Sequence, residues 1–187
     1  MHGDSADMSA ETTDTTAVEV YRPVTSSHTI GIPGFSHITN TYLSPLDYTG
    51  WSVSLNLDRL QAMKFNPERW IMDFETALEL DRDHNPARNA DMWRINLFLQ
   101  WGMLYRWHLP HAVTLAAGGA TSIDVGAIYN QRNGNNPVAA EASWTVDIKA
   151  MASWNTRIGR LPLTIVYQTS LPVVGVFFAP DYGELYY

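Results

Sequence analysis

A strict alternation of apolar and other side chains, with a period of two residues, dominates this chain and limits what it can fold into. The longest run covers residues 93–107, in which every odd-numbered position is apolar or aromatic. Runs of the same kind occupy residues 51–58, 70–80, 113–129, 142–154 and 161–171. Successive side chains of a β-strand point to opposite faces of the sheet, so this pattern indicates strands with one apolar face. No segment shows a convincing helical period, and the sequence therefore predicts an all-β, antiparallel fold.

The runs are long, and the connections between them alternate in length. Strands of soluble proteins usually have about five or six residues, whereas a tilted strand that crosses a membrane needs about 9–11 residues. Short connections are expected at residues 64–69, 109–111 and 155–160, and longer polar ones at residues 81–91 and 130–139. Outer-membrane barrels have short periplasmic turns and longer external loops. The sequence thus predicts a transmembrane β-barrel, and a soluble sandwich or a lipocalin-like barrel that binds a small apolar ligand is the alternative.

Aromatic residues gather at the ends of the apolar stripes. Membrane barrels carry two aromatic girdles in these places, because amphipathic rings lie at the level of the lipid headgroups. The predicted aromatic girdle consists of Trp51, Trp70, Trp93, Tyr105, Trp107, Tyr129 and Trp154.

The amino-acid composition argues against several classes of protein. The chain has no cysteine, which excludes a disulfide framework and any cysteine-based metal site. Its net charge of −7 argues against a nucleic-acid partner. Residues 1–24 are rich in Ser, Thr, Asp and Glu, and we expect them to form a flexible acidic leader before a barrel domain over residues 25–187. No signal peptide is recognisable at the N-terminus, so a location in the bacterial outer membrane implies that one has been removed.

The order of the turns predicts about eight strands. An ascending strand over residues 26–38 precedes the run at 51–58, which makes seven strands by residue 171, and bacterial barrels have an even number. A descending eighth strand that begins near Gly183 has only about five residues available. We therefore expect either a chain truncated from a larger barrel or a barrel that closes with an irregular last strand.

Two segments carry a family resemblance. Residues 41–50 read TYLSPLDYTG, and residues 175–187 read GVFFAPDYGELYY. With their spacing around Pro45, Gly50, Pro180 and Gly183, they resemble the two characteristic motifs of an uncharacterised outer-membrane barrel family, a domain of unknown function, from Bacteroides-like bacteria. The resemblance implies a Gram-negative outer-membrane setting and further strands after the second motif. It implies no activity, catalytic residue or cofactor.

Polar and charged side chains occupy the other face of the runs, which a membrane barrel turns toward its interior. Paired charges with hydrogen bonds ordinarily fill a small barrel. An open interior would instead form a narrow, porin-like pore, whose acidic excess disfavours anions. The predicted interior network consists of Asp58, Asp73, Glu75, Arg94, Arg106, Asp124, Asp147 and Lys149.

Candidate catalytic groups are sparse. His108 and Ser153 can both face the interior, which leaves a lipid-modifying outer-membrane enzyme as an alternative. No pair of histidines has metal-ligand spacing, and no HExxH-type motif occurs. The sequence does not decide whether the protein is an enzyme. It favours a structural or transport role without catalytic residues, metal or cofactor, and the expected partners are outer-membrane lipid and other envelope proteins.

Overall fold

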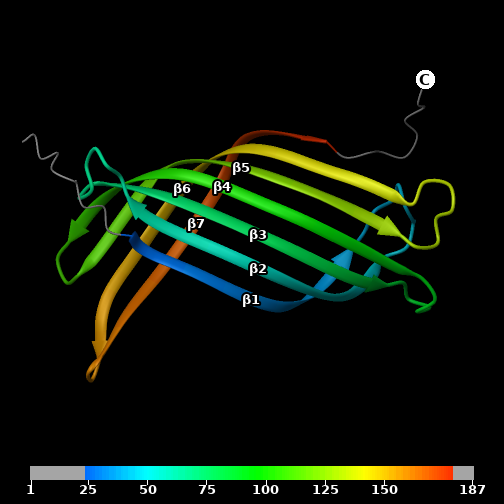
Figure 1. Ribbon diagram of the computed structural model, residues 1–187, viewed down its shortest axis with the longest axis horizontal. Coiled ribbons are helices and arrows are strands. Elements are labelled where there is room, and N and C mark those ends of the chain that lie inside the picture. Colours follow the sequence, from blue (N-terminus) through cyan, green and yellow to red (C-terminus); the bar gives the residue numbers. More distant parts are fainter. Residues whose placement is uncertain (1–23, 179–187) are drawn as a thin grey trace, which may run out of the picture.

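The computed structural model describes residues 24–178, and these form one curled antiparallel sheet without a helix (Figure 1). The strands alternate up and down, and each pairs with its neighbours in the sequence, in the order β1-β2-β3-β4-β5-β6-β7. The prediction of an all-β, antiparallel fold is confirmed. The strands are β1 (Val24–Ile38), β2 (Tyr48–Ala62), β3 (Trp70–His84), β4 (Asp91–Leu109), β5 (Val113–Asn130), β6 (Val138–Ile158) and β7 (Leu161–Phe178).

The described residues form seven strands, whereas the sequence predicted about eight. The segment expected to begin an eighth strand near Gly183 lies outside the described residues, as does the predicted acidic leader up to residue 23. Strand β7 also continues beyond residue 171, where the alternation was expected to end, and reaches Phe178. A bulge near Pro172 shifts the register of β7 against β6, so the period of two is interrupted in the sequence although the strand continues.

The predicted alternation of short and long connections holds only in part, because the connection of residues 63–69 is as long as that of residues 131–137 and longer than that of residues 85–90. Residues 63–69, 110–112 and 159–160 make the short-turn end, and residues 39–47, 85–90 and 131–137 make the long-loop end. In the tightest turn Gly159 has a φ of 62°, a left-handed conformation that glycine adopts without steric strain. Two predicted loop boundaries are wrong, because β3 continues to His84 and β6 continues to Ile158.

The sheet has two faces of different chemistry. Because the sheet is curled, side chains from distant strands meet on one face, which we call the concave face; the other is the convex face (Figure 1). Two apolar clusters lie on the concave face. One is at the long-loop end and includes Tyr48, Met92 and Ile128; the other is near the short-turn end and consists of Leu60, Ile71, Leu104, Ala116 and Met151. Polar side chains fill the space between these clusters.

Strands β1 and β7 are the edges of the sheet and run in the same direction. Among the described strands, only these two contain proline, at Pro33, Pro162 and Pro172. Proline lacks a backbone donor, which explains why it is confined to edge strands. Nearly every residue of β7 is exposed, and Gln168 is the exception along the strand.

Candidate functional site

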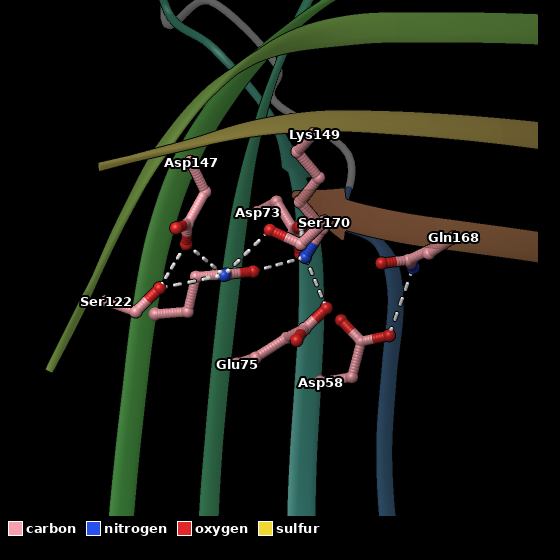
Figure 2. A network of polar contacts seen from close by, with 9 residues as sticks. Asp58, Asp73, Glu75, Ser122, Asp147, Lys149, Gln168 and Ser170 are labelled. Atoms are coloured by element: carbon pink, nitrogen blue, oxygen red, sulfur yellow. Dashed lines mark hydrogen bonds and ion pairs between the residues drawn. The ribbon is translucent and has the colours of Figure 1, made fainter. Parts of the chain in front are cut away.

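The ammonium group of Lys149 lies at the centre of a buried polar layer on the concave face (Figure 2). Lys149 is only 1% exposed, and its Nζ forms ion pairs with Asp73 and Glu75, both on β3. The same Nζ donates a hydrogen bond of 2.7 Å to Oε1 of Gln100 on β4. A buried ammonium is tolerated only when it is paired and hydrogen-bonded in this way. Lys149 therefore ties β6 to β3 and β4 across the interior.

Gln100 extends the layer to two further strands. Its amide nitrogen lies 3.0 Å from Oγ of Ser122, 3.0 Å from Oδ2 of Asp147 and 3.3 Å from Oγ of Ser170. Asp147 also accepts a hydrogen bond from the hydroxyl of Ser122. Strand β5 leaves room for these long side chains, because its concave face is built largely from glycine, alanine and serine.

The last contact of the layer crosses the open side of the sheet. Nε2 of Gln168 on β7 donates to Oδ2 of Asp58 on β2 over 3.3 Å, as Figure 2 shows. The second carboxylate oxygen of Asp58 and the amide oxygen of Gln168 are buried without a hydrogen-bond partner. Polar groups at this side of the interior are therefore less fully satisfied than those around Gln100.

A second group of charges lies between this layer and the long-loop end. Arg94 donates to Asp81 through Nε at 2.5 Å and forms an ion pair with Glu79 at 3.4 Å. Asp83 accepts a hydrogen bond of 2.9 Å from the hydroxyl of Ser36. The concave face of β3 thus carries a ladder of carboxylates, whose partners come from β4 and β1 near the long-loop end and from β6 in the middle.

The structure brings together five of the eight residues predicted for the interior network: Asp58, Asp73, Glu75, Asp147 and Lys149. Arg94 belongs to the second group, and Asp124 accepts a hydrogen bond from Asn96. Arg106 lies at the short-turn end, where it donates to the backbone oxygen of Pro67. Sequence reasoning did not single out Gln100, although its period placed it on the polar face.

Three carboxylates of the layer, those of Asp58, Asp73 and Glu75, have oxygens within 4.8 Å of one another and are spaced closely enough to hold a metal ion. However, the ammonium of Lys149 already lies against two of them. A bound cation would have to displace Lys149 and leave a second positive charge buried beside it. One ammonium partly neutralises three carboxylates and occupies the space between two of them, so the arrangement is a polar filling and a poor cation site.

His108 and Ser153 line the same cavity at the short-turn end. Nε2 of His108 lies 3.2 Å from the backbone oxygen of Glu68, and a nitrogen in this position must carry the proton. Nδ1 lies 3.2 Å from the hydroxyl of Thr114, which donates to it. Both ring nitrogens of His108 therefore have partners other than Ser153, and this geometry gives no support to a serine–histidine pair.

Aromatic side chains of the predicted girdle form two rows on the convex face. At the long-loop end, Trp51, Arg82, Trp93 and Tyr129 are consecutive partners across four strands, and the Arg82 guanidinium lies 5.1 Å from the ring centroid of Trp93. At the short-turn end, Trp70 and Tyr105 have ring centroids 5.3 Å apart, and Tyr105 and Trp107 have theirs 5.0 Å apart. Trp154 lies near this second row, beside Val113.

An ion-pair cluster borders the first row where β3 and β4 meet the loop between them. Asp91 accepts hydrogen bonds from Nε and Nη2 of Arg82, at 3.2 and 3.0 Å, and its other oxygen lies 2.7 Å from Nδ1 of His84. These contacts, first with Arg82 and then with His84, lower the pKa of the Asp91 carboxyl. The cluster fixes the Arg82 side chain over Trp93.

The motif at residues 41–50 closes the long-loop end. Leu43 and Tyr48 are buried in the apolar cluster there, and the backbone oxygen of Leu43 accepts a hydrogen bond of 3.1 Å from Asn130. Tyr42 contacts Asn136 of the loop between β5 and β6. A family model for proteins of unknown function, DUF3316, matches residues 5–187. The chain belongs to the DUF3316 family.

The family assignment covers nearly the whole chain and supports the resemblance to an uncharacterised family. None of the curated proteins and none of the solved structures compared with this DUF3316 chain matches it. Within residues 24–178, no helix is both long enough and apolar enough to cross a membrane.

Proposed function

We propose that this DUF3316 chain forms the wall of a bacterial outer-membrane β-barrel with a filled interior, and that it acts as a structural barrel through contacts with lipid and envelope partners. The observation that carries the proposal is the convex face. Large apolar side chains cover the middle of this face and are solvent-exposed on every central strand; examples are Leu55, Leu78, Ile95, Val125 and Ile148. A soluble protein rarely exposes an apolar surface of this extent, and a membrane barrel requires one.

The spacing of the two aromatic rows supports the same proposal. Trp93 and Tyr105 lie twelve residues apart on β4, which is about 40 Å along a strand. A strand tilted by about 40°, as in membrane barrels, covers about 30 Å of bilayer thickness over that length. The rows are therefore spaced to lie at the two lipid–water interfaces.

The buried polar layer around Lys149 favours a closed barrel over the porin-like alternative. Lys149, Gln100 and Asp147 are all buried, and their contacts join β6, which carries Lys149 and Asp147, to β4, which carries Gln100. The loop of residues 39–47 adds a second barrier at the long-loop end through its buried Leu43. A conducting pore needs a continuous polar path lined by water, and charges that pair with each other across the interior occupy that path.

The contacts across the interior indicate how many strands the curvature accommodates. Lys149 on β6 reaches β3, and Gln100 on β4 reaches Ser170 on β7. Each contact therefore joins a strand to the third strand along the sheet. Gln168 on β7 contacts Asp58 on β2, which is also three positions away if one strand lies between β7 and β1. Since β1 and β7 run in the same direction, one strand antiparallel to both completes a ring of eight. Closure of this kind satisfies the edge hydrogen bonds, which lipid cannot do.

Substitution on the convex face tests the membrane location. Leu97, in the middle of β4, is 41% exposed, and Leu109, at its end, is 44% exposed, so the two positions differ in depth and hardly in exposure. In lipid vesicles, we expect Leu97→Arg to lower the free energy of unfolding by about 2–4 kcal/mol, and Leu109→Arg by about 0–1 kcal/mol. Denaturant titration followed by tryptophan fluorescence measures both values. Equal effects, in a protein that stays folded and soluble without lipid, would overturn the proposal in favour of a soluble barrel.

Recordings in a planar bilayer test the filled interior separately. The folded protein is expected to give no current steps in potassium chloride, because the Lys149 layer and the loop of residues 39–47 block the path. Stepwise conductance would show that the barrel is a pore. A conducting protein that still shows the depth dependence at Leu97 would keep the membrane location and remove only the closed interior.

A further inference from the structure

A cup opens at the short-turn end of the concave face, and all seven strands contribute side chains to its wall. Its volume is about 490 Å³, within the range of sites for small organic ligands. Leu60, Ile71 and Met151 form its floor, together with the rest of the apolar cluster near this end. The polar layer around Lys149 lies on the other side of that cluster.

Side chains change character in the same order along two strands that line the cup. On β4 the concave positions read His108, Arg106 and Leu104 from the rim inward. On β6 they read Ser153 and then Met151, and Met151 is the lateral partner of Ala116, which in turn pairs with Arg106. The cup therefore has hydrogen-bonding groups at its rim and an apolar floor, and the side chain of Arg106, whose backbone is level with Met151, reaches the backbone oxygen of Pro67 in the loop at the rim. A site with this gradient suits a molecule with one polar and one apolar end.

The charge of the cup is opposite to that of the protein as a whole. The chain carries 19 acidic and 12 basic residues, yet none of the described residues that line the cup is acidic, while Arg106, His28 and His108 all line it. Nε of Arg106 is buried without a hydrogen-bond partner, and only its Nη2 is engaged, by the backbone oxygen of Pro67. The Arg106 guanidinium has no carboxylate partner among the described residues, so an anion in the cup would form a charge-assisted contact with it.

Acidic groups begin beyond the cup and would orient a ligand. Asp58 and Glu75 line an adjoining hollow, which shares His28 and Leu60 with the cup. An anionic head would be repelled from that side and attracted to Arg106. The hydrocarbon part would then lie against Val166 and the small exposed edges of Leu60 and Met151.

We propose that the cup is a binding site for a small anionic amphiphile, a carboxylate with a hydrocarbon chain of about eight carbons, with its head at Arg106. The site goes beyond the structural role proposed above and does not require it, because the cup is formed by the concave face alone. A ligand of this class would place its carboxylate against the Arg106 guanidinium and its hydrocarbon chain against Val166, which lines the cup and is 44% exposed.

Isothermal calorimetry of the full chain held in an uncharged amphipol, with each probe also titrated into the amphipol alone, tests the site. Octanoate is the probe, octyltrimethylammonium has the same chain with the opposite charge, and acetate has the same head without the chain. We expect octanoate to bind at least tenfold more tightly than either control. Equal binding of octanoate and octyltrimethylammonium would reduce the cup to a non-specific apolar surface and overturn the proposal, as would no heat of binding for octanoate at millimolar concentration.

Two substitutions assign the binding to the cup. Arg106→Gln should weaken octanoate binding about tenfold, since it removes the charge-assisted contact. Arg59→Gln removes the same charge from an exposed position on the convex face of β2 and should leave binding unchanged. Thr164→Trp places a large ring in the cup from the exposed strand β7, without touching the apolar floor, and should abolish binding.

Equal octanoate affinity in Arg106→Gln and Arg59→Gln would refute the assignment of the anionic head to Arg106. Unchanged binding in a folded Thr164→Trp protein would place the ligand elsewhere. Neither result bears on the depth dependence at Leu97, so failure of this site and failure of the membrane proposal can be told apart.

Discussion

The central strands and the edge strand β7 share the same alternating pattern, but the pattern leads to burial only on the central strands. On β3 the concave positions Ile71, Asp73, Asp81 and Asp83 are all almost completely buried, because strands on both sides and across the interior cover them. On β7 every described residue except Gln168 is exposed on both faces. Alternation therefore assigns a side chain to a face, whereas burial requires that other strands lie opposite that face. Buried charge can be placed on the central strands, and the edges carry prolines, a bulge and small polar residues instead.

The largest expected difference between the two regions concerns their contacts across the interior. Lys149→Met leaves Asp73 and Glu75 without their common counter-charge, and we expect a loss of about 3–5 kcal/mol in the free energy of unfolding. Gln168→Met on β7 removes one hydrogen bond to Asp58 and should cost about 1 kcal/mol. Denaturant titration of both variants in the same amphipol measures the difference.

A compensated variant serves as the control for Lys149. If the loss comes from uncompensated charge, adding Asp73→Asn and Glu75→Gln to Lys149→Met should restore much of the stability. Similar losses for Lys149→Met and Gln168→Met would mean that the centre and the edge bury charge to the same extent.

A smaller difference is expected between two glycines. Gly118 on β5 lies so close to β4 that an added Cβ would overlap the backbone oxygen of Met103, while an added Cβ at Gly31 on β1 meets nothing within 4 Å. Gly118→Ala should therefore lower the free energy of unfolding by about 1–3 kcal/mol, and Gly31→Ala should change it by less than about 0.5 kcal/mol. Thermal unfolding followed by circular dichroism compares them. An unchanged Gly118→Ala protein would show that β4 and β5 are less closely packed than the structure has them.

The sequence predicted the strands and the two faces, but it could not predict which interior side chains meet. The period of two placed Asp73, Glu75 and Lys149 on one face, yet their contact spans three strands and depends on the curl of the sheet, which no local pattern encodes. Asp81 was assigned to a loop because it begins a cluster of turn-forming residues, and its contact with Arg94 keeps it in β3. The same difficulty applies to Gln100, whose three acceptors come from β5, β6 and β7.

Because of the meander topology, contacts between neighbouring strands can form before contacts across the interior. Each strand pairs with its neighbour in the sequence, so every ladder can be established as a hairpin with little loss of chain entropy in closing the loop. The contacts of the buried polar layer join residues that are far apart in the chain. Lys149 and Glu75 are separated by 74 positions, and Gln168 and Asp58 by 110. They can form only after the hairpins between them have assembled and curved. The buried charges therefore form their contacts late in folding and stabilise the curvature of a sheet whose strands are already paired.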